Sequence, residues 1–491
     1  MRSNYVHFAS PQFRLLSDKQ IEELHLASLQ IMERTGVTFE SQEAIDLLGE
    51  AGADVSNPKR VKIPSYLVEQ ALRTAPKTIT LYTRDGEPAM VLNGMTSHFG
   101  GIAALEEYLD PYTRQRSQCY VEDIVDMIRV IDALPNLEWL MTISSYSTIP
   151  GVIADKVSIL QSIFNTPKPI ACCINDASSV REMAEVCSIV AGGGKEFRAK
   201  PFFICTSEPI TPLVQGKEVM EKSLACAEKG VPNVVYSAPL AGATAPATFP
   251  AVLALANAEF LSQLVVIQLK CPGAPVIYSG QPTIMDMKTT LFAYGAPESA
   301  FFIAALTELG HYYKLPVYGT AAEVDADTIG AQAAAEATYQ ILLSALSGND
   351  FVHGVGEMYQ GRMSSPEFAV LGSEIIDMVK VVMQGIEIND ETLPLDLIER
   401  VGPGGTYISE SHTLKHFRKF WVPKVFDRSM AKREGIKKCE DLLNEKTIEI
   451  LKTHKPKPLP EDLVKELKKV GKSWLDRVGL KEYPKRRDGE K

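Results

Sequence analysis

The chain has 491 residues, of which 45% are hydrophobic and 23% are charged, a composition typical of a folded globular protein and not of a disordered one. Its formal net charge of −10 excludes nucleic acid as the main partner, because phosphate backbones need a basic surface. No apolar run predicts a membrane span, and residues 1–10 lack the regions of a signal peptide. Eight cysteines are too few for a disulfide scaffold, so we expect cytoplasmic residence.

The first part of the chain, residues 1–94, is expected to form a helical cap with a small β-ribbon. Ser17 and Gln20 have the spacing of a capping box, and apolar residues recur at helical spacing from 21 to 32. Two further helices are predicted at 41–51 and 63–74. Residues 78–82 alternate like a strand and run into a turn at 84–87.

From residue 95 to 386, short apolar runs alternate with segments of helical period. The eight runs, each predicted to be a buried strand, are 97–101, 139–145, 169–174, 201–206, 233–237, 275–280, 316–320 and 350–356. The helices expected between and after them are 121–134, 153–164, 180–192, 215–229, 248–269, 289–313, 328–347 and 366–385. This alternation indicates an α/β protein with a parallel sheet covered on both faces.

Eight such units are the number that closes a (β/α)8 TIM barrel, so this is the fold that we predict for the catalytic domain. An open, doubly wound sheet is the alternative. It is less favoured because no glycine-rich phosphate loop follows the first strand.

The last part, residues 387–491, is expected to form a C-terminal helical extension. A sharp breaker, VGPGG, occupies 401–405, and a stiff proline-rich stretch at 456–460 joins basic helices. The basic run Lys485, Arg486 and Arg487 is predicted to be a frayed tail.

Parallel barrels carry their chemistry where strands end, so the predicted strand ends hold the candidate site. Three residues there are candidate catalytic groups: Glu323 and Asp325 after the seventh strand, and His353 in the eighth. Taken alone, His353 is as readily a hydrogen-bonded core histidine. No metal-binding motif occurs in the sequence, so we predict no metal site.

Aromatic residues and carboxylates also gather at these strand ends. The candidate substrate-binding residues are Phe99, Tyr146, Glu208, Tyr236, Tyr278, Gln281, Glu357, Tyr359 and Arg362. Each desolvated aromatic face attracts a quaternary ammonium by roughly 0.5–2 kcal/mol, and carboxylates add a negative field. Arg362 and His353 are candidates for a substrate carboxylate. The sequence thus predicts a pocket for a cationic small molecule, although any single tyrosine could instead be a packing residue.

Eight ordered blocks of the sequence resemble the trimethylamine methyltransferase (MttB) family. They are DALPN at 132–136, EPITPL at 208–213, AGATAP at 241–246, GQPTIMDM at 280–287, GAPE at 295–298, AQAAAE at 331–336, VGPGG at 401–405 and HTLKHF at 412–417. The resemblance runs from the N-terminal helices to about Asp427. It implies a barrel enzyme that passes a methyl group from a methylated amine to the cobalt of a cognate corrinoid-binding protein.

The resemblance also narrows the cofactor and the substrate. The archaeal trimethylamine enzymes of the family carry pyrrolysine, whereas this chain contains only the twenty common amino acids. It is therefore similar to the pyrrolysine-free branch, which is associated with quaternary amines such as glycine betaine, proline betaine and carnitine in one-carbon metabolism. The resemblance implies no tightly bound cofactor, because the corrinoid belongs to the partner protein. We also expect a homo-oligomer.

Two loops depart from the family pattern. After the eighth strand the family commonly reads His-Asp-x-Gly-Tyr-x-Glu-Ser-Gly, whereas residues 353–361 here read HGVGEMYQG. After the seventh strand the common Ser-Asp-Ala-Lys is replaced by VDAD at 324–327. Both loops lie at the predicted site, so the substrate is not fixed by the resemblance. Two alternatives also stay open: a barrel lyase or hydrolase that uses Glu323 and His353 as acid and base, and a betaine-binding protein without catalytic activity.

Overall fold

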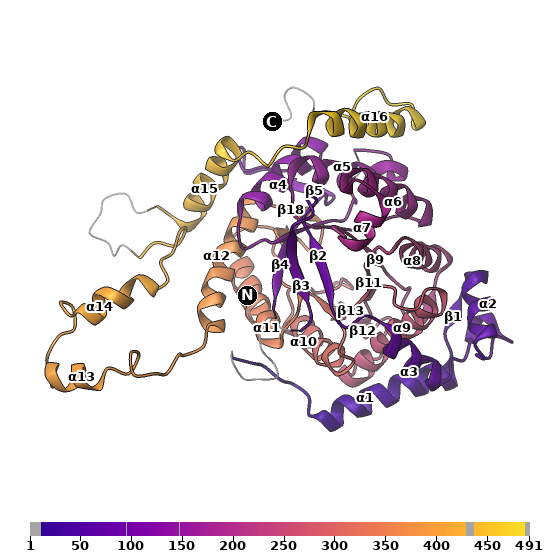
Figure 1. Cartoon of the computed structure of the whole chain (residues 1–491), viewed down its shortest axis with the longest axis horizontal. Coiled ribbons are helices and arrows are strands. Elements are labelled where there is room, and N and C mark those ends of the chain that lie inside the picture. Colours follow the sequence, from indigo (N-terminus) through magenta and orange to yellow (C-terminus); the bar gives the residue numbers. More distant parts are fainter. Residues whose placement is uncertain (1–10, 95, 147, 429–436, 487–491) are drawn as a thin grey trace.

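The computed structural model describes residues 11–94, 96–146, 148–428 and 437–486, and its centre is a closed barrel of eight parallel strands (Figure 1). In order around the barrel these strands are β4 (His98–Ala103), β7 (Trp139–Thr142), β8 (Ile170–Cys172), β9 (Phe203–Ser207), β11 (Asn233–Ser237), β13 (Val276–Gly280), β15 (Val317–Thr320) and β16 (Phe351–Val355). Pairing of β16 with β4 closes the ring. The predicted (β/α)8 barrel is confirmed, and each predicted strand overlaps an observed one.

Helices surround the barrel on the outside. They are α4 (Val121–Ala133), α5 (Gly151–Asn165), α6 (Ala177–Ala191), α7 (Gly194–Ala199), α8 (Lys217–Lys229), α9 (Phe249–Lys270), α10 (Pro297–Tyr312), α11 (Ala331–Ser347) and α12 (Pro366–Met383). One predicted boundary is wrong. The helix expected from residue 289 begins only at Pro297, so residues 289–296 form a loop.

Short strands extend some of the loops at the barrel ends. They are β5 (Glu107–Leu109), β6 (Arg116–Gln118), β12 (Leu240–Ala241), β14 (Thr283–Ile284), β17 (Glu357–Met358) and β18 (Met363–Ser364). β17, β18, β5 and β6 form one small sheet, and β12 pairs with β14. These pairings tie together loops that follow different barrel strands.

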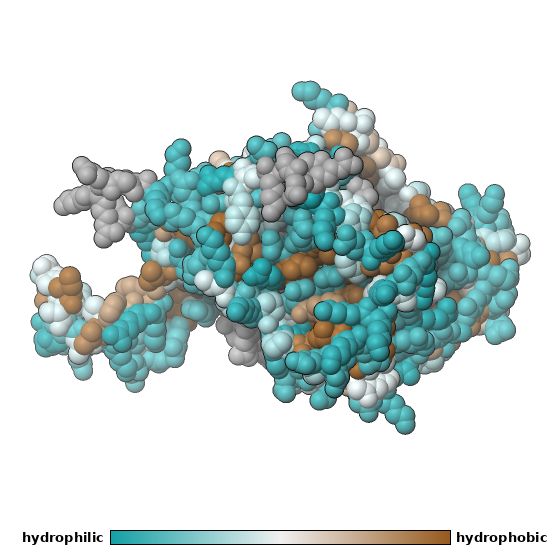
Figure 2. Space-filling view, turned by 90° about the horizontal axis from the view of Figure 1, so that it is seen from above, coloured by the Kyte–Doolittle hydropathy of each residue, from teal (hydrophilic) through white to brown (hydrophobic). Residues whose placement is uncertain are grey.

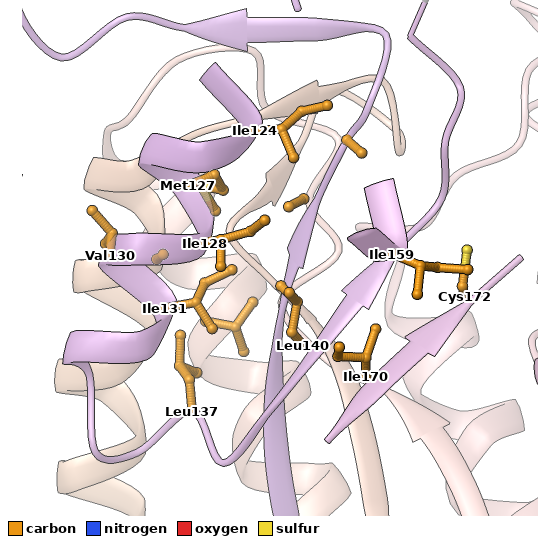
Figure 3. Packing of buried hydrophobic residues seen from close by; sticks show 14 of the residues in the cluster. Ile124, Met127, Ile128, Val130, Ile131, Leu137, Leu140, Ile159, Ile170 and Cys172 are labelled. Atoms are coloured by element: carbon orange, nitrogen blue, oxygen red, sulfur yellow. The ribbon is translucent and has the colours of Figure 1, made fainter. Parts of the chain in front are cut away.

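Successive residues of each barrel strand face opposite sides of the wall. Leu140, Ile170 and Cys172 face outward and join Ile128 and Ile131 of α4 in one buried cluster (Figure 3). The inward residues form a separate cluster, which includes Ile102, Trp139, Met141, Ala171, Ile204, Val234, Ile277, Tyr318 and Phe351. This alternation decides which strand residues can reach a cavity inside the barrel.

A β-hairpin fills the N-terminal end of the barrel. β2 (Ile79–Tyr82) pairs antiparallel with β3 (Pro88–Leu92). Leu81 and Met90 of this hairpin belong to the same buried cluster as the inward strand residues. The N–H of Tyr82 donates to the carbonyl of Pro201, which lies just before β9. The strand predicted at 78–82 is therefore part of a plug at this end.

The N-terminal helices pack on the barrel's helical layer. They are α1 (Asp18–Gln30) with its π-helical continuation η1 (Ile31–Thr35), α2 (Gln42–Glu50), the 3-10 turn η2 (Pro58–Arg60) and α3 (Ser65–Thr74). The predicted capping box of Ser17 and Gln20 is present. β1 (Thr38–Phe39) pairs with β10 (Val214–Gln215), and Leu24 and Val68 share one buried cluster with Val252 of α9. These helices thus share a core with the barrel.

α9 is long and apolar enough to cross a membrane by length and composition, contrary to the sequence expectation that no such run exists. However, 94% of its apolar window is buried inside the protein. Packing between α1, α3 and the barrel therefore accounts for its composition.

The C-terminal extension wraps along the outside of the barrel. Its elements are α13 (Leu395–Val401), α14 (Ser411–His416), η3 (Phe417–Lys419), α15 (Cys439–Thr453) and α16 (Glu461–Arg477). α13 and α14 lie apart from the barrel, whereas α15 lies beside α4 and α12 and α16 beside α5 (Figure 1).

The prediction of a frayed basic tail is wrong for Arg486. Its side chain is 5% exposed and forms ion pairs with Asp110 at 3.1 Å and with Asp123 at 2.8 Å. Asp110 follows β5 and Asp123 lies in the first turn of α4, so Arg486 is tied to the barrel. Arg487 lies outside the described residues.

Candidate active site

A cavity of about 320 Å³ lies at the C-terminal ends of the barrel strands. Seven predicted site residues line it: Glu208, Tyr236, Gln281, Glu323, His353, Glu357 and Arg362. Its volume is within the range of small-molecule sites. The place agrees with the general rule for parallel barrels, in which loops after the strands build the site.

The structure does not bring Phe99, Tyr146 and Tyr278 into this cavity. All three side chains lie between the barrel and its helices. The hydroxyl of Tyr278 donates to Asn257 at 3.0 Å, and that of Tyr146 donates to the carbonyl of Ala154 at 3.0 Å. The cause is strand alternation: Phe99 and Tyr278 occupy outward positions, so their predicted contact with a substrate is replaced by a packing role.

Asp325 and Tyr359 lie near the cavity but do not line it. Burial raises the pKa of Asp325, while the nearby backbone N–H groups of Gly295 and Tyr294 oppose that rise. Asp325 therefore lies beside the loop that carries Tyr294. The ring of Tyr359 is covered by the guanidinium of Arg116, 4.0 Å from its centroid, and by that of Arg362 at 5.6 Å, so it packs against these two side chains.

Two carboxyl groups and one imidazole meet at the buried end of the cavity. His353 Nε2 lies 3.0 Å from Glu323 Oε1 and 3.9 Å from Glu357 Oε2, and all three residues are only 2% exposed. The side-chain amide of Gln281 donates to Glu323, and the Glu323 N–H donates to Gln340 Oε1 at 2.9 Å. These bonds fix the orientation of Glu323.

The two carboxyl groups differ in their surroundings. Burial, together with the nearby negative charge of Glu323, raises the pKa of Glu357 well above its usual value. Glu357 Oε2 also has no hydrogen-bond partner among the described residues. Burial and the neighbouring carboxylate thus both favour the neutral form of Glu357, whereas Glu323 is held by the hydrogen bonds described above.

Glycines shape the loop that supplies His353 and Glu357. Gly354 has a φ of +112°, and a Cβ at this position would lie 2.5 Å from the carbonyl oxygen of Ala321. Only glycine fits that close approach and that backbone conformation. The sequence HGVGE thus turns directly from the end of β16 into β17, and both polar side chains enter the cavity.

The same three polar side chains could also hold a metal ion. Their ligand atoms all lie within 4.8 Å of one another. Oxygen and imidazole nitrogen donors in this number suit a divalent cation such as Zn²⁺. The sequence prediction of no metal site stays a prediction.

Three aromatic residues that the sequence analysis missed line the cavity: Phe292, Tyr294 and Tyr318. Tyr318 stacks on the ring of His353 with centroids 5.1 Å apart and meets Tyr236 edge-on at 5.7 Å. Phe292 and Tyr294 contact each other at 4.6 Å. Burial and the neighbouring Glu323 raise the pKa of all three tyrosines well above its usual value, so these rings stay neutral.

Opposite charges mark the opening of the cavity. Glu208 is exposed and accepts a hydrogen bond from the Cys173 thiol at 3.3 Å. The side chain of Arg362 is 51% exposed and pairs with Glu106 at 3.3 Å. Burial and Glu208 raise the pKa of Cys173 well above its usual value, which keeps it a thiol and makes it a poor nucleophile.

The arrangement is suited to binding a cation. One fixed carboxylate lies at the buried end, neutral aromatic rings surround the space, and mixed charge lies at the opening. Aromatic faces and a carboxylate together stabilise a positive ligand that is held away from water.

Comparison with known proteins agrees with the fold and identifies the family. The chain resembles the trimethylamine methyltransferase MttB of Desulfitobacterium hafniense (strain DSM 10664 / DCB-2), with 32% identity over 94% of each chain. It is 29% identical to the glycine betaine methyltransferase of D. hafniense (strain Y51), over 85% of this chain and 88% of that protein.

Among solved structures, the monomethylamine methyltransferase MtmB of Methanosarcina barkeri has a similar fold. The TM-score is 0.54 and the identity 11%, covering 96% of this chain and 89% of that one. The model of the family described as "Trimethylamine methyltransferase (MTTB)" matches residues 1–472. This methyltransferase family, matched over nearly the whole length, is the one to which the chain belongs.

Proposed function

We propose that the protein transfers a methyl group from a quaternary amine, such as glycine betaine or a related betaine, to the Co(I) corrinoid of a separate corrinoid-binding protein. The observation that carries this proposal is the cavity itself, in which the Glu323 carboxylate lies among Tyr236, Tyr294 and Tyr318. A permanently charged trimethylammonium group fits that chemistry, because it cannot lose a proton and gains from every aromatic face.

In this proposal the protein binds and orients the methyl donor. Glu323 and the tyrosine rings hold the ammonium group, and one N-methyl carbon points toward the opening. Arg362 at the opening can pair with a carboxylate on the substrate. A quaternary nitrogen leaves as a neutral tertiary amine without prior protonation, so no general acid is needed. The electron pair of the broken C–N bond stays on nitrogen, and the Co(I) acceptor supplies the pair for the new bond.

We also propose how the domains, the supporting residues and the partner protein contribute to this reaction. The barrel, residues 95–386, carries the site, while residues 1–94 and 387–491 flank it. Asp325 acts as a positioning residue for the loop with Tyr294, and Glu357 sets the charge of the pocket. The partner corrinoid-binding protein is the methyl acceptor, the chain itself holds no tight cofactor, and the reaction takes place in the cytoplasm.

The test is a methyl-transfer assay with the purified full chain. It is mixed with a corrinoid-binding protein reduced to Co(I) and with glycine betaine, proline betaine, carnitine or trimethylamine. We expect one of the quaternary amines to change the visible spectrum of the corrinoid and to yield its demethylated amine by mass spectrometry. Glu323→Gln should lower the rate by at least about 10²-fold, since it removes the charge of the pocket. Asp327→Asn, on an exposed position of the same loop, is the matched control.

A lyase or hydrolase reaction is the second candidate, and it is favoured by the distance between Glu323 and His353. Glu323 Oε1 and His353 Nε2 are 3.0 Å apart, which is the geometry of an acid–base pair. Turnover of a substrate in the absence of any corrinoid-binding protein would favour a lyase or hydrolase. Tight betaine binding without methyl transfer to any acceptor would instead identify a binding protein.

A further inference from the structure

A buried glutamine on α11 lies behind the cavity. Gln340 is 5% exposed, and its side chain does not line the cavity itself. Figure 2 shows hydrophilic side chains over much of one face of the molecule, which is the usual place for amides and charged groups. A polar side chain in the interior is costly unless it is hydrogen-bonded, so the partners of Gln340 show what it holds.

Both ends of the Gln340 amide bind the backbone of loops at the cavity. Its Oε1 accepts from the N–H of Glu323 at 2.9 Å, and its Nε2 donates to the carbonyl of Glu323 at 2.8 Å. Nε2 also donates to the carbonyl of Tyr294 at 2.9 Å. Glu323 follows β15, whereas Tyr294 precedes α10. One side chain therefore joins the residue that supplies the cavity carboxylate to a residue that supplies an aromatic ring.

Glu336 lies one helical turn before Gln340, on the same side of α11. Its Oε2 accepts from the N–H of Asp325 at 2.9 Å and from that of Ala326 at 3.4 Å. Its carboxylate also packs on Gly295, since a Cβ added to this glycine would lie 2.6 Å from Glu336 Cδ. Glu336 thus contacts the same two loops that Gln340 joins.

Two of the sequence blocks that carry the family resemblance meet at this contact. Gly295 begins the block GAPE, and Glu336 ends the block AQAAAE. Neither block lines the cavity. Their contact therefore gives both blocks a place directly behind it.

The backbone next to Glu323 needs support of this kind. Ala322 has a φ of +63°, in the left-handed region that residues other than glycine rarely adopt. Such a conformation persists only where surrounding contacts hold it, and it is common at functional sites. The two bonds from Gln340 fix the peptide groups on either side of the Glu323 Cα, so they hold both the loop and the direction of its carboxylate.

We propose that Gln340 and Glu336 are positioning residues of the cation pocket. They hold the Glu323 carboxylate and the Tyr294 ring at the separation at which both groups contact one ammonium ion. This role rests on the proposed function, in which the ligand is a methylated ammonium group. A cation gains fully from a carboxylate and a ring only when it contacts both at once, so a displaced loop weakens both contacts together.

The first test is the binding of tetramethylammonium chloride to the full chain by calorimetric titration, which needs no corrinoid-binding protein. Gln340→Leu has a side chain of similar volume without the three hydrogen bonds, so the Kd should rise about 10-fold. Glu336→Ala should raise the Kd as well, whereas Glu336→Gln, which keeps an acceptor oxygen for Asp325, should stay within about 2-fold. Glu336 is only partly buried, so Glu336→Ala tests the same role if Gln340→Leu does not fold.

Gln268→Leu is the matched control. Gln268 on α9 is 4% exposed and also binds a loop through both ends of its amide, with bonds to the Gly273 N–H and the Ala274 carbonyl, both at 2.9 Å. This loop precedes β13, at the opposite end of the barrel from the cavity. Gln268→Leu should lower the melting temperature, as Gln340→Leu does, but leave the Kd unchanged.

A double-mutant cycle shows whether Gln340 acts through Tyr294. Tyr294→Ala should raise the Kd clearly in the wild-type background and much less in the Gln340→Leu background, because the ring is already displaced there. Equal losses in the two backgrounds would overturn the positioning role.

Failure of this role and failure of the proposed function give different results. A wild-type chain that does not bind tetramethylammonium contradicts the cation pocket, and the positioning role falls with it. A wild-type chain that binds, with the same Kd in Gln340→Leu and in Glu336→Ala, overturns the positioning role alone. Equal weakening of binding by Gln268→Leu and Gln340→Leu also overturns it, because both effects would then come from lost stability.

Discussion

Tyr236 and Tyr278 lie on neighbouring strands, β11 and β13, yet only Tyr236 faces the cavity. In the strand register, Tyr236 pairs with Ser279 and Tyr278 pairs with Val317. Paired residues face the same side of the sheet, so Tyr278 points outward together with Val317. Tyr318 pairs with Ser279 and faces inward with it. Residue type alone could not separate these tyrosines. His353 and Phe351 face the same side of their strand, and Tyr318 pairs with Phe351, so Tyr318 faces inward with them. The same alternation places Tyr278 on the outward side.

This difference predicts separate effects for the two tyrosines. Tyr236→Ala should raise the Kd of the most active quaternary amine about 5–30-fold, because one aromatic face is lost, while Tyr236→Phe should keep it within about 2-fold. Tyr278→Phe should leave the Kd unchanged and lower stability by about 1 kcal/mol, since the bond to Asn257 disappears. Calorimetric titration and thermal melts measure both. Equal loss of binding in the Tyr236→Ala and Tyr278→Phe variants would contradict the assignment.

The Glu323, His353 and Glu357 group predicts the effect of metal ions. We expect chelator-treated enzyme to keep its activity, because Glu323 already accepts from Gln281 and lies beside His353. Added Zn²⁺ should raise the KM for the amine and leave kcat unchanged, since both cations use the same carboxylate. Initial rates at several Zn²⁺ and amine concentrations measure the KM and kcat values. Activity that is lost with the chelator and restored by Zn²⁺ would show that the metal is required.

At the scale of elements, the sequence patterns predict every barrel strand, but they do not predict the loop before α10. The sequence predicts helix for residues 289–296, whereas they form a loop that carries Phe292 and Tyr294 into the cavity. A local signal was available, because Pro297 stands at the first helical turn, a preferred place for proline. The arrangement of the loop was not available, since the Tyr294 carbonyl accepts a hydrogen bond from Gln340 of α11, which lies far from it in the sequence.

Asp350 joins three elements at the start of β16. Its carboxylate accepts from the N–H of Asn93 at 2.8 Å and of Val317 at 2.9 Å, and also from Gly94. Asp350→Asn should destabilise the fold by about 2–4 kcal/mol, because an amide NH₂ would face one of these donors. A lower midpoint in thermal or urea unfolding measures the effect. Asp327→Asn, on an exposed loop position, should leave the midpoint unchanged, and an unchanged midpoint for Asp350→Asn would contradict the reasoning.

At the scale of the whole molecule, contacts between distant parts of the chain were beyond the sequence. The basic run at 485–487 predicts a frayed tail, but Arg486 contacts Asp110 and Asp123, which are 376 and 363 residues away in the sequence. Likewise, α9 is apolar on all sides because helices on one side and the barrel on the other cover it. Local patterns carry no information about such partners.

The Arg486 contacts predict that this residue stabilises the barrel. Arg486→Ala should reduce the stability by roughly 2–4 kcal/mol, since it leaves two buried carboxylates without their cation. Lys485→Ala, at a side chain that is 70% exposed, is the matched control. Unfolding curves for the two variants should differ clearly. Identical curves would indicate that the tail contributes nothing to stability.

The β2–β3 hairpin has a consequence for kinetics. With one end of the barrel filled, donor and acceptor must use the same entrance, and the larger acceptor would cover it once bound. On the proposed function, the amine therefore enters first and the demethylated product leaves only after the corrinoid-binding protein departs. Steady-state kinetics should show a compulsory order, in which a high concentration of acceptor protein inhibits by trapping the empty enzyme.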